Sequence, residues 1–202
     1  MKKIIIFGAG GHARSCIDVI MDNNKFVIAG FLDNKKSNFG KFKYLGSDKD
    51  IFRIKKKYNY AFIAIGQIKN NLTRINLFNK LLDAGYKFPS FISKKAIISK
   101  ETKIGDGTII MHGAIVNSGA KIGRNSIINS GVIIEHGSQI GDHCHLAPGS
   151  IVNGQTLIGN GTFVGSGAVV RENIKVGENC IISANCFVKK NLPKKSTFIN
   201  EK

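Results

Sequence analysis

The chain has no apolar run that approaches the roughly 20 residues a helix needs to cross a bilayer. The short apolar stretch in MKKIIIFGAGGHARS is too brief for the core of a signal peptide. We interpret it as a buried strand that leads into a glycine turn. We therefore expect a cytoplasmic protein without membrane insertion.

Cysteine and acidic residues are also scarce. The four cysteines show neither a metal-binding spacing nor a disulfide framework. Thirteen acidic residues face 30 basic ones, and residues 1–95 hold 19 of the basic and 6 of the acidic residues. A basic surface favours polyanions such as nucleic acid or phosphorylated small molecules, although solvated lysines of a biased composition are an alternative. No nucleic-acid module is recognisable, so we expect no nucleic-acid partner.

What the chain does have is a strict period of six. Every sixth residue from Ile92 to Val188 is Ile, Val or Leu, and the residue four positions later is nearly always small. Neither a helix, with a period near 3.6, nor a plain strand, with a period of 2, gives this spacing. Short extended segments joined by corners do, so the pattern predicts a parallel β-helix of hexapeptide repeats. Three of the cysteines fall at the small position, as small buried hydrophobic residues.

A second period of 18 shows that three hexads make one coil of a three-sided prism. The residues before the core positions should point outward and form three columns. One is mostly polar: Lys103, Lys121, Gln139, Leu157, Lys175. Two are apolar: Ile109, Ile127, His145, Phe163, Ile181, and Ile97, Ile115, Ile133, Ile151, Val169, Phe187. We expect the apolar columns to pack on copies of the chain or on its N-terminal domain. His145 is the single polar break in its column.

Residues 1–88 predict a separate α/β half-Rossmann domain, and residues 89–202 the β-helix domain. Strands are expected at 2–8, 26–32 and 60–65, with a helix after the first strand and another that starts at Asn71 as its N-cap. Gly8, Gly10 and Gly11 follow the first strand, and such glycines let the backbone approach a phosphate. A full dinucleotide fold needs two mononucleotide halves. The room here suits a mononucleotide or a nucleotide-sugar, with His12 pointing into the same crevice.

Histidines are the candidate catalytic groups, because a neutral imidazole can act as a general base near pH 7. Glu135-His136 opens one hexad and His145 lies nine residues further, on an adjacent side of the prism. The two are too far apart to pair within one coil unless a neighbouring subunit supplies one of them. His112 and His143 are interpreted as corner residues without a catalytic role.

The chain resembles the bacterial sugar O- and N-acyltransferases of the left-handed β-helix superfamily. These include the UDP-4-amino-sugar N-acetyltransferases of bacillosamine synthesis and the sialic acid O-acetyltransferases. The resemblance spans nearly the whole chain and rests on these segments: IIIFGAGGHA at its start, GFLD at 30–33, AFIAIG at 61–66, FPSFISKKAIIS at 88–99, IIEHGSQIGDHCHLAPGS at 133–150 and TFVGSGAVV at 162–170.

The resemblance implies an acetyl-CoA-dependent acetyltransferase of surface glycan biosynthesis, a homotrimer with active sites between subunits and no metal. His136 would be the general base toward a UDP-linked 4-amino-sugar, Glu135 its carboxylate support, and Asn129 an active-site residue. His145 would contact the acetyl or thioester end of acetyl-CoA, and Gly154 would leave room for the pantetheine arm. The nucleotide-binding set would be Gly8, Gly10, Gly11, His12, Asp33 and Gly66.

Two features depart from the family pattern. Gly137 stands where many members have an acidic residue directly after the catalytic histidine, so support for His136 must come from Glu135 or elsewhere. STFINEK replaces the usual Gly-Val-Pro-Ala segment at the C-terminal side, which bears on contacts to the adenine end of CoA.

Other functions stay open at the level of sequence. O-acetylation of sialic acid or a related sugar is the nearest alternative, because no residue separates an amine from a hydroxyl acceptor. A carbonic-anhydrase-like metal enzyme would use His136, His143 and His145 as ligands across a subunit interface. A non-catalytic sugar-nucleotide sensor is the third alternative.

Overall fold

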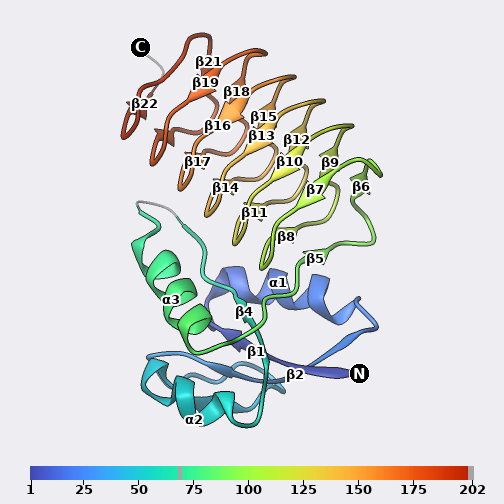
Figure 1. The fold of residues 1–202 in the computed structure, drawn as a ribbon, viewed down its shortest axis with the longest axis vertical. Helices are drawn as coiled ribbons and strands as arrows, with labels where there is room; N and C mark the ends of the chain where they lie inside the picture. Colours follow the sequence, from blue (N-terminus) through green and yellow to red (C-terminus); the bar gives the residue numbers. More distant parts are fainter. Residues whose placement is uncertain (68–69, 200–202) are drawn as a thin grey trace.

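The computed structural model describes residues 1–67 and 70–199, and it contains a small α/β layer below a three-sided prism (Figure 1). The half-Rossmann domain and left-handed parallel β-helix predicted from the sequence are confirmed. None of the helices in the described residues is long and apolar enough to cross a membrane.

The N-terminal sheet is parallel, with strand order β3-β2-β1-β4. Its strands are β1 (Lys2–Phe7), β2 (Phe26–Leu32), β3 (Tyr44–Gly46) and β4 (Tyr60–Ile63). The helical elements are α1 (Gly11–Met21), a 3-10 turn (Asp48–Asp50), α2 (Ile51–Lys55) and α3 (Leu72–Asp83). The strands at 26–32 and near 2–8 and 60–65 are thus confirmed within two residues, whereas β3 and α2 had no clear sequence signal.

The predicted cap of α3 is wrong in its detail. Asn71 does stand at the N-cap position, but its side chain makes no cap hydrogen bond. Its Nδ2 atom donates instead to the carbonyl oxygen of Gly161 in the prism, at 2.9 Å. The side chain of Asn71 therefore binds a distant segment of the chain and does not cap the helix as its residue type and position predicted.

Each side of the prism is a parallel sheet of two-residue strands, one per coil. The domain-facing wall consists of β5 (Phe91–Ile92), β8 (Ile109–Ile110), β11 (Ile127–Ile128), β14 (His145–Leu146), β17 (Phe163–Val164), β20 (Ile181–Ile182) and β22 (Thr197–Phe198). The apolar wall consists of β6 (Ile97–Ile98), β9 (Ile115–Val116), β12 (Ile133–Ile134), β15 (Ile151–Val152), β18 (Val169–Val170) and β21 (Phe187–Val188). The lysine wall consists of β7 (Lys103–Ile104), β10 (Lys121–Ile122), β13 (Gln139–Ile140), β16 (Leu157–Ile158) and β19 (Lys175–Val176).

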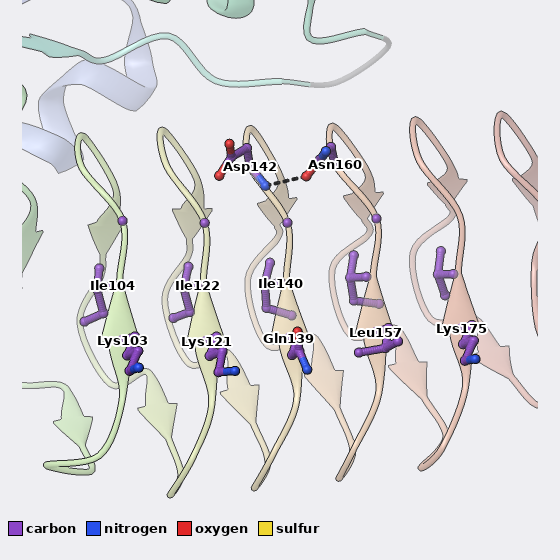
Figure 2. Close-up of a pocket in the computed structure, with 16 residues that line it drawn as sticks. Lys103, Ile104, Lys121, Ile122, Gln139, Ile140, Asp142, Leu157, Asn160 and Lys175 are labelled. Atoms are coloured by element: carbon purple, nitrogen blue, oxygen red, sulfur yellow. Dashed lines mark hydrogen bonds between the residues drawn. The ribbon is translucent and has the colours of Figure 1, made fainter.

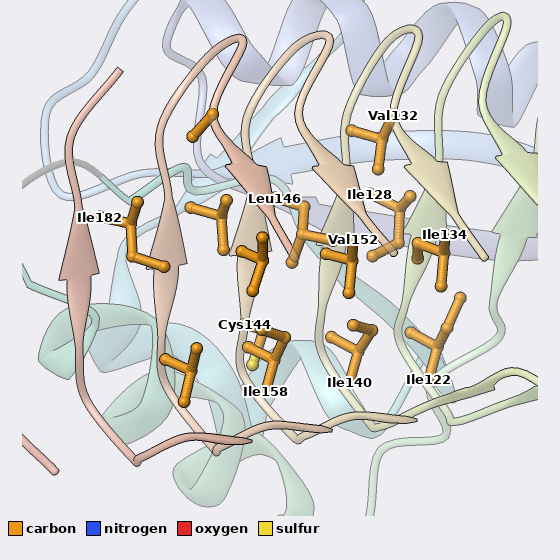
Figure 3. Close-up of a cluster of buried hydrophobic side chains, with 14 of the residues drawn as sticks. Ile122, Ile128, Val132, Ile134, Ile140, Cys144, Leu146, Val152, Ile158 and Ile182 are labelled. Carbon is orange, nitrogen blue, oxygen red and sulfur yellow. The ribbon is translucent and has the colours of Figure 1, made fainter. Parts of the chain in front are cut away.

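The second residue of each strand fills the prism, as the hexad pattern predicts (Figure 3). Ile128, Ile134 and Ile140 from one coil stack beneath Leu146, Val152 and Ile158 of the next, and all are buried. The register places each strand against the residue 18 positions on, so like side chains meet in columns. Burial is incomplete at the ends of the prism: Ile92 is 40% exposed, and Ile98, Ile104 and Phe198 are partly buried.

The two apolar outward columns have different environments. Ile109 and Ile127 of the domain-facing wall are buried in one cluster with Ala13, Cys16 and Ile20 of α1. The first part of this column is therefore covered by the N-terminal domain, one of the two options that the sequence left open. The apolar wall has no such cover, and Ile97 is 67% and Phe187 46% exposed.

A single core deletion should measure how strongly the coils depend on one another. Leu146 is fully buried in the prism. Leu146→Ala removes its contacts and leaves a cavity, so we expect a loss of about 2–5 kcal/mol in the free energy of unfolding, measured by urea titration. Gln139→Ala, on the exposed side of the lysine wall, should change it by no more than about 0.5 kcal/mol. Equal losses in the two variants would contradict the packing role assigned to Leu146.

Candidate functional site

A pocket lies where the N-terminal sheet meets the prism. This junction pocket has a volume of about 660 Å³. The α/β layer supplies the turn after β1 and the ends of β2 and β4, and the prism supplies two side chains. Its lining includes Gly8, Gly10, Gly11, His12, Asp33, Gly66, Gln67, Thr73, Asn129 and His145. Because ligands of parallel α/β sheets bind at the carboxyl ends of the strands, the position fits a ligand site.

The glycine turn is shaped for close approach of a ligand to the backbone. Gly8 has φ +102°, and a Cβ atom there would lie 2.9 Å from Cγ1 of Ile65. A Cβ atom at Gly10 or Gly11 would meet no atom within 4 Å, so that side of the turn is open. Gly10 is the N-cap of α1 and leaves the helix start without a side-chain cap. The free N–H groups and the helix dipole there suit an anion such as a phosphate.

Asp33 fixes the glycine turn as well as lining the pocket. Its Oδ2 atom accepts from the backbone N–H of Ala9 at 2.8 Å, and its Oδ1 atom accepts from that of Lys35 at 3.0 Å. A carboxylate oxygen can accept more than one hydrogen bond. Asp33 therefore keeps capacity for a ligand hydroxyl, but its first effect is on the shape of the turn.

His12 and His145 face each other across the junction pocket, with ring centroids 6.1 Å apart. Burial, and next the positive charge of Arg74, lower the pKa of His12 to about 4. Burial, then the charges of His12 and Arg74, lower the pKa of His145 to about 3. Both rings are therefore neutral at pH 7, and neither is well matched to act as a general base there.

Gln67 and Arg74 belong to the surroundings of the site, and we had not predicted them from the sequence. Arg74 is 1% exposed although it carries a full charge. It lies at helical spacing from Leu77, Phe78 and Leu81, the buried face of α3. An arginine on an otherwise apolar helix face was the sequence feature that could have indicated a buried polar contact. The sequence around Gln67 has no periodicity and offered no such feature.

His136 lies elsewhere, at the corner between the apolar wall and the lysine wall. Its side chain is 66% exposed, and its Nδ1 atom is 3.6 Å from Oε2 of Glu135. That separation is a close charge contact but too long for a hydrogen bond. Asn117, one coil earlier, donates from Nδ2 to the same Oε2 atom at 2.9 Å and orients the carboxylate. Glu135 is thus the carboxylate beside His136, and its support of that ring stays a prediction.

Gly154 lies against the His136 ring. A Cβ atom at Gly154 would stand 2.8 Å from both Cε1 and Nε2 of the imidazole. The residue 18 positions after His136 must therefore be glycine for the ring to take this place. The room that we expected Gly154 to leave for a cofactor is occupied in part by the histidine itself.

The predicted site residues thus form two groups within one chain. His12, Asn129 and His145 line the junction pocket with the glycine turn, whereas Glu135, His136 and Gly154 share a prism corner. Across residues 1–67 and 70–199, no three His, Cys, Asp or Glu side chains gather as a metal site.

A second hollow of about 690 Å³ runs along the lysine wall, where Lys103, Lys121 and Lys175 follow one line (Figure 2). It is a face of the prism and contains none of the predicted site residues.

Comparison with known proteins gives two family matches. The PglD N-terminal domain family matches residues 3–81. The bacterial transferase hexapeptide family (six repeats) matches residues 101–136, 119–154 and 155–190. The two families divide the chain between them in the same order as the α/β layer and the prism.

A sequence relative is the UDP-N-acetylbacillosamine N-acetyltransferase of Bacillus subtilis (strain 168), 34% identical over 113 residues. The alignment covers 55% of this chain, and the chain spans only about half, 52%, of that relative.

Solved structures match over nearly the full length. One is a histidine-to-asparagine mutant of perosamine N-acetyltransferase from Caulobacter crescentus in complex with CoA and GDP-perosamine. It has a TM-score of 0.91 and 27% identity over 99% of this chain and 94% of that chain. Another is the acetyltransferase domain of PglB from Neisseria gonorrhoeae FA1090 in complex with acetyl coenzyme A. Its TM-score is 0.87 with 24% identity, over 97% of this chain and 95% of that one, and at that identity it supports the fold alone.

The neutral buried histidines predict a pH dependence of stability. His145 takes up no proton in the folded state until pH approaches its lowered pKa of about 3, whereas in the unfolded chain it is protonated below pH 6.5 or so. The contribution of His145 to the free energy of unfolding is therefore fully present above about pH 6.5 and decreases as the pH falls below 6.5. From pH 7.5 to pH 5 we expect His145 to account for a loss of about 1–2 kcal/mol in urea titrations. His145→Gln should show a smaller loss over the same range, and an unchanged dependence would contradict the assignment.

Proposed function

We propose that the chain is a bacterial hexapeptide-repeat sugar acyltransferase with a PglD-type N-terminal domain, and that it transfers acetyl from acetyl-CoA to the amine of a nucleotide-linked amino-sugar. The observation that carries this proposal is the match over 99% of the chain with an N-acetyltransferase in complex with CoA and GDP-perosamine. The open glycine turn in this chain provides a place for the diphosphate of such a substrate.

His136 is the proposed general base. The sugar amine attacks the carbonyl carbon of the thioester, a C–N bond forms, and the C–S bond breaks. His136 accepts the proton that the amine loses, and the imidazolium then gives this proton to the departing CoA thiolate. An exposed imidazole next to an oriented carboxylate suits this role, because Glu135 stabilises the imidazolium that forms.

The junction pocket is the proposed site of the sugar-nucleotide. Backbone N–H groups at the start of α1 face the diphosphate, and Asp33 and Gly66 flank the nucleoside end. We favour a UDP-linked 4-amino-sugar of surface glycan synthesis, and the name of the Bacillus subtilis relative, UDP-N-acetylbacillosamine N-acetyltransferase, supports the UDP link. A GDP-linked sugar is the alternative, because the Caulobacter crescentus enzyme is in complex with GDP-perosamine.

We propose that the active unit is a homotrimer. The apolar wall presents an outward column of Ile, Val and Phe that the N-terminal domain does not cover. Such a face is rarely left in water, and cyclic symmetry would cover it in every copy. His136 stands at the edge of this wall, so an adjacent copy can bring its own junction pocket to the Glu135–His136 corner.

Loss of the base should abolish most turnover. His136→Ala is expected to lower kcat by about 10²–10⁴-fold. The assay measures release of CoA thiol from acetyl-CoA with UDP- and GDP-linked 4-amino-sugars, and with sialic acid as a hydroxyl acceptor. His112→Ala is the matched control, because His112 bonds Ser93 and lines neither the junction pocket nor the Glu135–His136 corner. Near-normal turnover in His136→Ala would exclude His136 as the base, and release only with sialic acid would make the enzyme an O-acetyltransferase.

Subunit mixing tests whether a site is shared between copies. His136→Ala and His145→Ala chains, each weakly active alone, should regain activity when they are unfolded and refolded together. If the base of one copy serves the junction pocket of the next, random trimers restore about a quarter of the sites. A mixture no more active than its components would place both groups of residues in one copy, and sedimentation would report the assembly state independently.

A further inference from the structure

The proton on the His145 ring can be located from its neighbours. The Nδ1 atom lies 3.0 Å from the main-chain carbonyl oxygen of Gln67. A carbonyl oxygen only accepts hydrogen bonds, so Nδ1 must carry the proton. In a neutral imidazole the other nitrogen, Nε2, then holds a lone pair and acts only as an acceptor.

The hydrogen bonds of Asn129 independently support the assignment of the proton to Nδ1. Its Oδ1 atom accepts from the backbone N–H of Ser130 at 2.9 Å, which fixes the orientation of the amide. The Nδ2 group therefore faces His145 and donates to Nε2 at 3.3 Å. This bond is long for its type, so a better-placed donor from a ligand can share or replace it.

The Gln67 carbonyl is held in place by a buried clamp. The Gln67 side chain donates from Nε2 to the carbonyl oxygen of Gly161 at 3.1 Å, and its Oε1 atom accepts from Nη2 of Arg74 at 2.8 Å. Arg74 in turn donates to the carbonyl oxygens of Asn125 and His143. Gln67 and Arg74 are 4% and 1% exposed, so the clamp is shielded from water.

The charges around the ring also act against a second proton. Arg74 is a buried cation whose partners here are neutral carbonyl and amide oxygens, and His12 faces His145 from α1. A protonated His145 would add a positive charge beside a buried one in a poorly solvated place. The hydrogen-bond geometry and the neighbouring charges thus both favour the neutral form of the His145 ring.

We propose that Gln67 and Arg74 are positioning residues that hold His145 as a neutral hydrogen-bond acceptor, so that Nε2 recognises a hydroxyl or amine N–H of the sugar-nucleotide. This rests on the proposed function, and it deepens it by assigning a specificity contact in the junction pocket. It also differs from the family expectation that His145 contacts the acetyl or thioester end of the cofactor. A thioester carbonyl oxygen is itself an acceptor and gains no hydrogen bond from a lone pair.

The ring nitrogens can be observed directly by NMR of protein labelled with ¹⁵N-histidine, with His145 assigned from the spectrum of His145→Gln. We expect one neutral tautomer, protonated on Nδ1, without titration between pH 5 and pH 8. A proton on Nε2, or a ring that titrates in this range, would overturn the proposal without need of any further variant. The measurement requires neither substrate nor turnover, so it stands even if the proposed reaction is wrong.

Gln67→Met tests the clamp. It keeps a side chain of similar length but removes both side-chain hydrogen bonds, so the carbonyl loses its anchor and His145 should become a mixture of tautomers. Asn71→Leu is the matched control, because Asn71 also donates to the Gly161 carbonyl oxygen but is not bonded to Gln67 or His145. A Gln67→Met spectrum like that of the wild type, or an equal change in Asn71→Leu, would overturn the role of the clamp.

Kinetics then separate the two possible partners of Nε2. In Gln67→Met we expect KM for the sugar-nucleotide to rise about 10-fold, as for one lost hydrogen bond, while KM for acetyl-CoA stays within about 2-fold. The opposite pattern, a rise confined to acetyl-CoA, would assign His145 to the cofactor and refute the proposal.

Discussion

The stacking of inward aliphatic side chains at intervals of 18 residues is the constraint on which the rest of this molecule depends. Burial of these columns stabilises the fold, because each coil covers the apolar surface of the one before it. The same stacking fixes where every outward residue stands. His136 meets Gly154, and Asn117 meets Glu135, because each pair is separated by one full coil.

The contact between the α/β layer and the prism determines which side chains surround the junction pocket. The domain-facing wall is apolar where α1 covers it, and it becomes polar at His145, where the junction pocket opens. A buried arginine at this seam donates to carbonyl oxygens of the prism. Its hydrogen bonds join the two parts, and burial, to which its charge adds, lowers the pKa of His12 and His145 so that both are neutral at pH 7.

The prism and the location of the glycine turn could be predicted from the sequence because both depend on local period and spacing. The partners of Glu135 and His136 could also have been found by counting one coil back or forward. Gln67 and Arg74 could not be assigned a role in this way, because they donate to main-chain carbonyls 51 to 94 residues away, and carbonyls carry no sequence signature. The prediction that the Asn71 side chain caps α3 was wrong for the same reason, because this side chain donates to a main-chain carbonyl of the prism.

The corner geometry has a consequence for how such chains can change in length during evolution. A single inserted residue within a wall would turn every later side chain to the opposite face, and the stacked columns would no longer match. Insertion or loss of one whole coil beyond Gly154 would preserve all columns and leave the Glu135–His136 corner intact. The prism can therefore lengthen or shorten by whole coils at its far end, whereas the separation of His136 and Gly154 stays fixed at one coil.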